Sequence, residues 1–213
     1  MKRIFLSLIM LAAIAVGVKA QGNFGVRVSY ELACPGDVNL TKGFKADLFG
    51  NSSGFSVGVV YNMPVFFGFY FEPGVSIAYN TFSMNRALVD ATLEQEVSAA
   101  SVRMWDFRVP VIGGYKFNLL PGIGLSVFTG PELSLGMSAK AHYKFGTLSA
   151  SESAYGGDGF MNRTDVKWRF GVGATFAGHL YGALSGAVGL CDRMEDDYSM
   201  KSNLFDITIG YNF

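Results

Sequence analysis

The 213-residue chain contains only two cysteines and two histidines, and neither residue type is clustered. No metal-ligand spacing surrounds Cys34 or Cys191, so we expect no metal site and no cofactor. The chain also lacks an excess of basic residues, with 17 Lys and Arg against 17 Asp and Glu. A nucleic-acid-binding protein would need a basic stripe, and we therefore expect no nucleic-acid partner.

Long apolar runs are missing as well, except at the amino terminus. Residues 1–20 have the order of a signal peptide: a positive start, the 15-residue apolar run Ile4–Val18, and small residues around Lys19 before cleavage after Ala20. That run would rise only about 22 Å as a helix, which is too short for a hydrocarbon core of ~30 Å. Cleavage would leave residues 21–213 as one domain with 14 basic and 17 acidic residues.

Half of the residues are nevertheless hydrophobic, and the chain contains 27 Gly, 19 Phe and 10 Tyr. High hydrophobicity without a spanning helix, combined with abundant Gly and aromatic residues, is typical of a membrane β-barrel. The last residues also alternate at period two, with one face formed by Phe205, Ile207, Ile209, Tyr211 and Phe213. Such a strand, ending on an aromatic residue, is typical of the closing strand and assembly signal of a bacterial outer-membrane barrel.

The alternation predicts eight strands, most of them near the ten residues that a tilted strand needs to cross a bilayer. Their ranges are 23–32, 53–62, 68–79, 103–117, 122–137, 166–177, 180–190 and 203–213. Long connections (33–52, 81–102, 138–165 and 191–202) alternate with the tight turns 63–67, 118–121 and 178–179. We therefore predict an all-β fold, an eight-stranded antiparallel up-and-down transmembrane β-barrel with its long loops outside and its turns in the periplasm. The Gly-, Ser- and Ala-rich third connection is expected to be a mobile loop.

A secreted or periplasmic lipocalin-like barrel is the alternative, because it shows the same period with its faces exchanged. Gly, Ser and Ala dominate the polar face here, whereas a soluble barrel would carry many Lys, Glu and Thr there. Aromatic residues also gather near both strand ends, as in the two girdles of a membrane barrel. These features favour the outer membrane and its lipid bilayer over a soluble ligand-binding protein.

Strand parity directs ten charged side chains into the barrel. They are Arg27, Glu31, Glu72, Asp106, Arg108, Lys116, Glu132, Lys167, Arg169 and Asp206. An eight-stranded barrel is only wide enough for side chains to fill, and buried charges are tolerated there only when they are paired. Five positive and five negative charges therefore predict a lumen plugged by ion pairs. A narrow ion path or a proton relay is the functional alternative.

The two cysteines follow the first and seventh strands, at the end of the barrel that carries the long loops. Only the last strand separates these two strands after closure, so about 10 Å would lie between them at the rim. A Cys34–Cys191 disulfide is a hypothesis in an oxidising compartment. The alternative is a pair of loop thiols that never meet.

Catalysis is not expected from the two histidines. His142 falls in the third long connection and His179 in a periplasmic turn, so they are predicted at opposite faces of the membrane. His142 has possible partners in its own loop, namely Ser149, Ser151, Asp158 and Asp165, but a loop rich in Ser and Asp offers these by chance. We predict no catalytic residues, and a lipid-modifying outer-membrane enzyme is the third hypothesis.

Several short motifs resemble the PorT-like outer-membrane β-barrel family of Bacteroidetes. They are Trp105-Asp-Phe-Arg-Val-Pro-Val-Ile112, Tyr115-Lys-Phe117, Thr129-Gly-Pro-Glu-Leu133, Arg169-Phe-Gly-Val-Gly-Ala174 and Tyr211-Asn-Phe213. The resemblance spans the mature chain and implies an eight-stranded outer-membrane barrel. Some relatives take part in secretion or motility assemblies, but no residue here carries that role over. We predict a non-enzymatic scaffold that contacts lipid and the barrel-assembly machinery and that offers its outer loops to protein partners.

Overall fold

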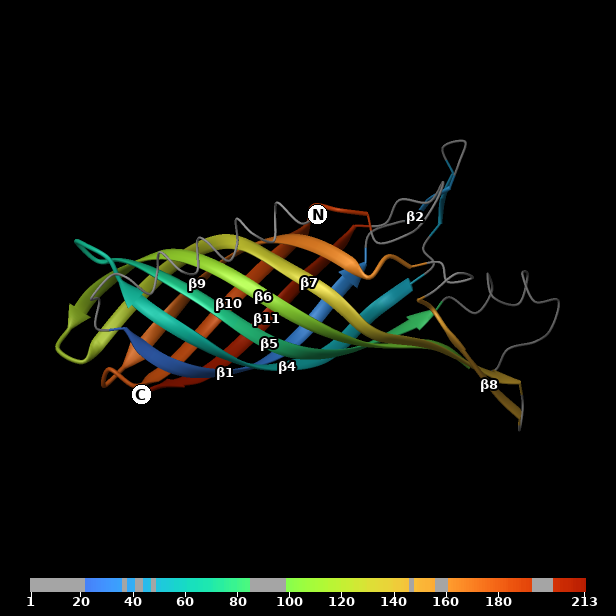
Figure 1. The fold of residues 1–213 in the computed structure, drawn as a ribbon, viewed down its shortest axis with the longest axis horizontal. Helices are drawn as coiled ribbons and strands as arrows, with labels where there is room; N and C mark the ends of the chain where they lie inside the picture. The colour runs from blue at the N-terminus through green and yellow to red at the C-terminus, as the bar shows by residue number, and fades with distance from the viewer. Residues whose placement is uncertain are drawn as a thin grey trace.

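The computed structural model describes residues 22–35, 38–40, 44–46, 49–84, 99–145, 148–155, 161–192 and 201–213 (Figure 1). The predicted signal peptide and cleavage site lie outside these residues. The described residues contain no helix that is long and apolar enough to cross a membrane.

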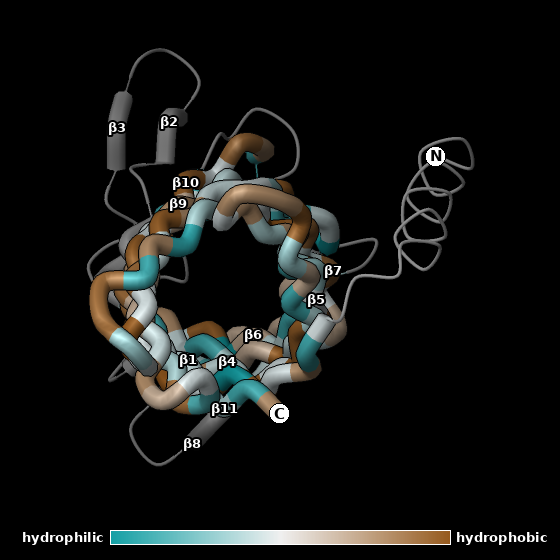
Figure 2. The backbone as a smooth tube through the Cα atoms, turned by 90° about the vertical axis from the view of Figure 1, so that its left-hand side faces the viewer, coloured by the Kyte–Doolittle hydropathy of each residue, from teal (hydrophilic) through white to brown (hydrophobic). Residues whose placement is uncertain are grey.

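Eight long strands close into one antiparallel barrel. They are β1 (Asn23–Pro35), β4 (Phe49–Pro64), β5 (Phe69–Met84), β6 (Ala99–Leu120), β7 (Ile123–Phe145), β9 (Thr164–Phe176), β10 (Leu180–Gly189) and β11 (Ser202–Asn212). They pair in the order β6-β5-β4-β1-β11-β10-β9-β7, and the β6–β7 pairing completes the ring (Figure 2). The predicted fold class is confirmed.

Each predicted strand corresponds to one of these eight strands, and the first pairs with the last. In the β1–β11 ladder, Val28 lies opposite Ile209 and Glu31 opposite Asp206. The three tight turns connect β4 to β5, β6 to β7 and β9 to β10, and each contains a glycine with positive φ (Gly68, Gly122 and Gly178). Glycine adopts this backbone conformation without a steric penalty, which permits the short reversals.

The structure corrects the prediction for the third long connection. Residues 138–145 continue β7, and β8 (Leu148–Ser153) folds back on it with Lys140 opposite Ser153. The Gly-, Ser- and Ala-rich composition indicated a loop, but residues 138–144 pair with the extended β6, and β8 pairs with β7. The first connection likewise contains the small hairpin of β2 (Val38–Leu40) and β3 (Phe44–Ala46).

A β-bulge in β7 marks the change from the barrel to this extension. Trp105 pairs with Ser138 while Asp106 pairs with Gly136, so Met137 is an extra residue without a partner on β6. Before the bulge, on the side of the turns, even-numbered residues of β7 such as Glu132 are buried. After the bulge, on the side of the loops, the odd-numbered residues Ala139 and Ala141 are buried and Lys140 faces outward. The bulge therefore exchanges the two faces of the strand.

Gly130 of β7 lies close to the backbone of the neighbouring strand β6, so a larger residue there should destabilise the barrel. A Cβ on Gly130 would meet the backbone oxygen of Val111 well inside contact distance and would lie 3.0 Å from Ile112 Cα. Backbone atoms cannot rotate away, so Gly130→Ala should lower the free energy of unfolding by about 1–3 kcal/mol. The measurement is urea unfolding in lipid vesicles, followed by tryptophan fluorescence.

Gly113→Ala is the matched control for this prediction, because Gly113 lies on the facing strand. The nearest atom to a Cβ there is Thr129 O at 3.9 Å, an ordinary contact. The control should change the free energy of unfolding by less than about 0.5 kcal/mol. Equal losses in the two variants would show that close packing at Gly130 is not the cause.

Candidate functional site: the charged barrel interior

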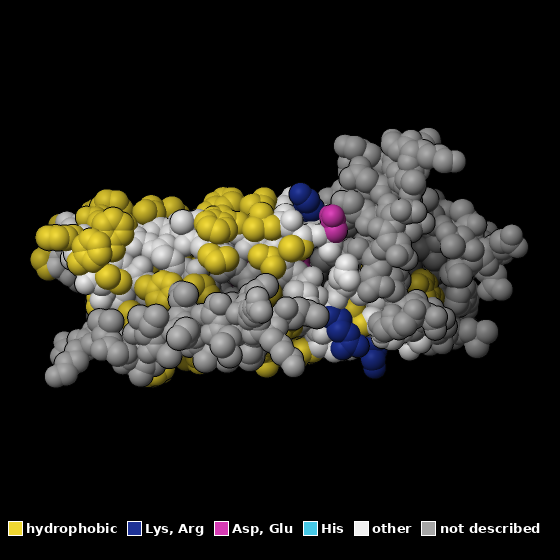
Figure 3. All heavy atoms as spheres, turned by 45° about the horizontal axis from the view of Figure 1, so that its top comes forward, with side chains coloured by type: hydrophobic (Ala, Val, Ile, Leu, Met, Phe, Trp, Pro, Cys, Tyr) yellow, Lys and Arg dark blue, Asp and Glu magenta, His cyan; other side chains and the backbone are white. Residues whose placement is uncertain are grey.

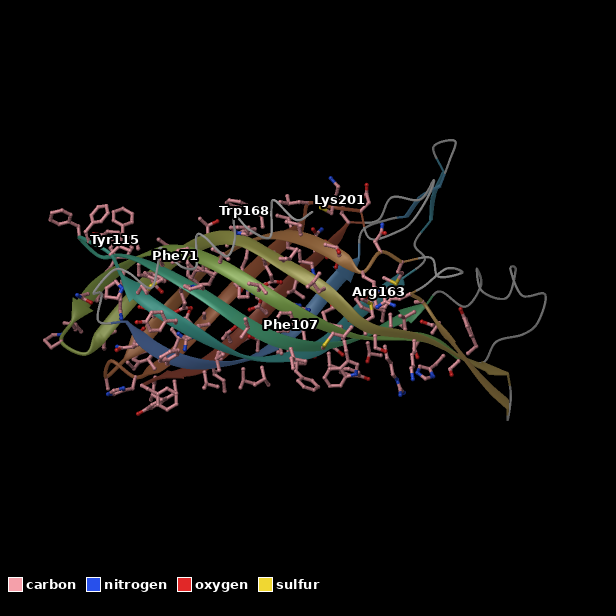
Figure 4. All side chains as sticks on the ribbon, viewed as in Figure 1. Phe71, Phe107, Tyr115, Arg163, Trp168 and Lys201 are labelled. Atoms are coloured by element: carbon pink, nitrogen blue, oxygen red, sulfur yellow. The ribbon has the colours of Figure 1, made fainter. Side chains whose placement is uncertain are left out.

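The outer face of the barrel is apolar, as the alternation predicts. The exposed hydrophobic residues include the carboxyl-terminal row Phe205, Ile207, Ile209, Tyr211 and Phe213. Figure 3 shows hydrophobic side chains over the middle of the barrel and one of its ends. In Figure 4 the side chains of Tyr115 and Trp168 lie on the outer side of the wall. The lipocalin-like alternative is wrong for this chain, since a soluble barrel would place its apolar face inward.

Aromatic rings form contacts at both ends of this apolar face. Toward the loops, the rings of Phe55, Tyr79 and Trp105 have centroids 4.9 to 6.5 Å apart. Toward the turns, the rings of Phe69 and Tyr115 are 4.9 Å apart. Two aromatic girdles around an apolar band are the pattern of an outer-membrane barrel.

Charged residues form a layer across the middle of the barrel interior. Arg108 Nη1 donates a hydrogen bond of 2.7 Å to Glu31 Oε1, and the Arg108 guanidinium lies 3.9 Å from Asp106 and 4.0 Å from Glu132. Asn80 also donates to Glu31, at 3.1 Å. All four charged side chains are at most 3% exposed. One guanidinium thus compensates carboxylates from three strands.

Arg169 on β9 extends this layer across the barrel. Its guanidinium forms hydrogen bonds of 2.8–2.9 Å with Glu132 Oε2 and a short ion pair with Asp206 on β11. Ser185 on β10 donates to Asp206 at 2.7 Å. Because Glu132 contacts both arginines, the two ion-paired groups are continuous. Together with the hydrogen bonds of Asn80 and Ser185, they connect seven strands.

A second layer lies closer to the turns. Arg27 Nη2 forms an ion pair of 3.1 Å with Glu72 and donates to Asn212 at 2.8 Å. Asn62 donates to Glu72 at 2.9 Å. The Arg27 guanidinium also lies 4.1 Å from the ring centroid of Tyr181 on β10. Tyr181 was not predicted, since the small residues of β10 left its two faces undecided by parity.

Two small cavities lie inside the barrel. One, of about 90 Å³, is bordered by both charged layers, and the other, of about 50 Å³, lies toward the turns. Arg27, Glu72 and Tyr181 line both cavities and so form the boundary between them. Arg108 Nε and Glu132 Oε1 line the larger one and form no direct hydrogen bond with the described residues. These volumes and polar walls suit a few bound waters.

Two charged residues depart from the expected arrangement. Lys167 forms an ion pair of 3.4 Å with Asp165, a fully buried residue that the sequence had placed in a loop. Lys116 lines the cavity at the turn end, and it forms no ion pair with any residue that the structure describes. The interior charges are thus arranged around three arginines and Lys167.

An apolar cluster occupies the interior at the loop end. It consists of Ala33, Phe82, Val102, Met104, Ala139, Ala141, Ala154, Tyr155, Met161, Ala187 and Leu204. Tyr155 and Met161, from the segments between β8 and β9, pack among residues of the barrel strands. The Tyr155 ring lies directly against Gly136, where a Cβ would collide with it. Sequence parity missed this cluster, because Tyr155 and Met161 lie outside regular strands.

The predicted disulfide is not formed in this structure, which has Cys191 as a free and exposed thiol. The hypothesis assumed that Cys34 and Cys191 lie at the same level along the barrel axis, whereas the strand register separates them. Cys34 pairs with Asn203 on β11, whereas Ala187 pairs with Leu204, which directs Cys191 about three residues beyond Cys34. Two strand spacings and this offset exceed the Cα separation that a disulfide allows.

The histidines lie at opposite ends of the barrel. His142 is on the extension of β7, where Ser151 lies opposite it on β8. Of its other proposed partners, Asp165 lies in the interior with Lys167, Ser149 is opposite Lys144, and Asp158 lies outside the described residues. At the turn end, His179 Nδ1 is 2.8 Å from Asn212 O, and its ring stacks on Tyr211.

Comparison with known proteins identifies one matching family model, described as "Outer membrane protein beta-barrel domain", over residues 12–194. Similar solved structures include Ail of Yersinia pestis, with 14% identity, a TM-score of 0.47, and coverage of 90% of this chain and 99% of that one. Neisserial surface protein A has 11% identity, a TM-score of 0.44 and coverage of 89% and 97%. OprG of Pseudomonas aeruginosa has 9% identity, a TM-score of 0.44 and coverage of 91% and 97%. Among curated proteins, none matches this sequence.

Proposed function

Because the chain belongs to the outer membrane protein beta-barrel domain family and lies in the outer membrane, we propose that it is a non-enzymatic scaffold with a closed lumen. The observation that carries this proposal is the pair of charged layers beneath an apolar cluster, all inside one barrel. Recognition would then belong to the parts of the chain beyond the outer membrane surface.

The energetics of the interior support a closed lumen. An ion crossing the barrel would have to separate Arg27 from Glu72 and then Arg108 from Glu31, each time leaving a buried charge uncompensated. It would also have to pass the apolar cluster around Met104 at the loop end. The two cavities, of about 90 and 50 Å³, offer room for only a few waters, and Arg27, Glu72 and Tyr181 line both of them.

We also propose that the chain is a PorT-like member of its family. Three of the motifs that carry the resemblance meet in the central charged layer. The motif Trp105–Ile112 contributes Asp106 and Arg108, Thr129–Leu133 contributes Glu132, and Arg169–Ala174 contributes Arg169. On the outer face of the barrel, Trp168, the residue before Arg169, donates a hydrogen bond of 2.8 Å to Thr129 of the motif Thr129–Leu133. The shared motifs would therefore preserve the lumen and leave the loops free to vary.

The scaffold's interaction-capable part would be its outer end. The strands β6 and β7, of 22 and 23 residues, are about twice the length that a bilayer requires. Together with β8 they would hold the loops away from the lipid on a rigid support, where protein partners could bind. The barrel-assembly machinery would recognise the exposed row of hydrophobic residues that ends in Phe213.

Planar-bilayer recording tests the closed lumen. The purified protein should give no stable, uniform conductance steps, because ion pairs and apolar side chains fill the interior. A general porin reconstituted from the same detergent provides the control that inserted barrels are detected. Reproducible steps of one size from the wild-type protein would contradict the proposal and favour a narrow ion path.

A further inference from the structure

Two exposed cations lie directly opposite each other on neighbouring strands. Arg103 of β6 pairs with Lys140 of β7 in the antiparallel ladder, two residues above the pairing of Trp105 with Ser138. Both side chains are exposed. Arg103 lies on the same outward face of β6 as Trp105, and Lys140 points outward because the bulge at Met137 has shifted the parity of β7. We call Arg103 and Lys140 the rim pair.

The rim pair lacks an acidic partner within the part of the chain that the structure describes, where neither side chain forms an ion pair. The residues beside it in the ladders are polar but uncharged: Thr81 is opposite Arg103 on β5, and Ser153 is opposite Lys140 on β8. Like charges directly opposite each other destabilise an antiparallel pair. An anion placed between them would convert this repulsion into attraction.

The position of the rim pair indicates the source of that anion. Trp105 belongs to the loop-end aromatic girdle, which lies at the level of the lipid headgroups. Arg103 lies two residues from Trp105 along β6, on the side of the loops and on the same outward face. In Figure 3 the Lys and Arg side chains lie toward one end of the barrel, past most of the hydrophobic side chains. The rim pair therefore faces the headgroup region of the outer leaflet.

We propose that the rim pair binds a phosphate group of a phosphorylated glycolipid in the outer leaflet. Arginine presents a planar set of donors that matches phosphate oxygens, and lysine adds a mobile point charge. Ser101 and His142, which pair just above the cations, supply further polar groups on this face. This inference depends on the membrane location and is independent of whether the lumen conducts.

Vesicles of defined composition test the proposal. The wild-type protein is folded into phosphatidylcholine vesicles alone, with a minority of diphosphorylated lipid A, or with the same amount of dephosphorylated lipid A. Urea midpoints, followed by tryptophan fluorescence, should rise only with the phosphorylated lipid. In Arg103→Gln/Lys140→Gln the apparent affinity for that lipid should fall by about 30-fold, because each basic side chain near an anionic surface contributes to binding.

Reversing the charge of Lys140 should affect stability in neutral lipid and the response to phosphorylated lipid in opposite directions. Lys140→Glu places a carboxylate opposite Arg103, so it should raise the midpoint in phosphatidylcholine alone and abolish the response to phosphorylated lipid A. Lys201→Gln is the control: this exposed cation, which Figure 4 places at the loop end, lies apart from the rim pair and should leave the response unchanged.

Three outcomes would overturn the proposal. The first is an unchanged lipid response in the double glutamine variant. The second is an equal response of the wild-type protein to dephosphorylated lipid A, which would assign the effect to the acyl chains or sugars. The third is an equal shift from a soluble sulfated polysaccharide added to phosphatidylcholine vesicles, which would assign the rim pair to a ligand outside the membrane.

Discussion

Replacing Arg108 with methionine should lower the free energy of unfolding by about 3–5 kcal/mol, because it leaves buried carboxylates without their shared cation. Arg108 is 2% exposed and contacts Glu31, Asp106 and Glu132. Methionine has a similar length, so the loss would report charge more than volume. Urea unfolding in phosphatidylcholine vesicles, followed by tryptophan fluorescence, measures the change.

Two further variants separate charge from packing at Arg108. Removing one carboxylate together with the cation, in Arg108→Met/Glu31→Gln, should recover part of the stability, since fewer buried charges then remain uncompensated. On the same strand, Arg103→Gln changes an exposed cation and should alter the free energy of unfolding by less than about 0.5 kcal/mol in neutral lipid. A loss at Arg108 no larger than at Arg103 would mean that water screens the interior charges.

Placing arginine on the lipid-facing surface should cost stability according to depth. Leu184 of β10 is exposed and lies beside Val172 of β9 and Ile207 of β11, near the middle of the apolar band. Leu184→Arg should lower the free energy of unfolding by about 2–4 kcal/mol, because a charge there would be surrounded by hydrocarbon. The measurement is again urea unfolding in phosphatidylcholine vesicles.

Leu180→Arg is the matched control, since Leu180 lies on the same strand and the same face. It is the first residue of β10, next to the turn, where a charge can reach the headgroups. The expected cost is about 0–1 kcal/mol. Similar costs at Leu180 and Leu184 would mean that the hydrocarbon band does not end between these two positions.

Strand alternation was sufficient to predict the barrel, because period two is strong wherever one face meets lipid and the other meets charge. The pairing of the first and last strands and the inward direction of Arg27 and Arg108 follow from parity and closure alone. Parity does not predict which charges contact each other, because those contacts depend on the register between neighbouring strands. Glu31 meets Arg108 rather than Arg27, although Arg27 is on its own strand.

Three further features were not predicted from the sequence, and each has a physical cause. In β10, glycine and alanine on both faces remove the contrast that parity needs, so Tyr181 was not predicted to lie inside. Asp165 was assigned to a loop because β9 begins two residues earlier than the apolar alternation indicates. The extension of β7 with β8 was missed because small residues predict flexibility, whereas here they pack inside the barrel beside Tyr155.

The bulge at Met137 has a consequence for how this protein can change over evolution. Side chains in a strand alternate, so inserting or deleting one residue in an uninterrupted strand reverses every position beyond it. An extra residue absorbed at a bulge confines such a reversal to one side. The outer extension can therefore gain or lose residues while the lipid-facing and charged rows below Met137 keep their directions. The membrane half and the exposed half of this one strand are free to diverge at different rates.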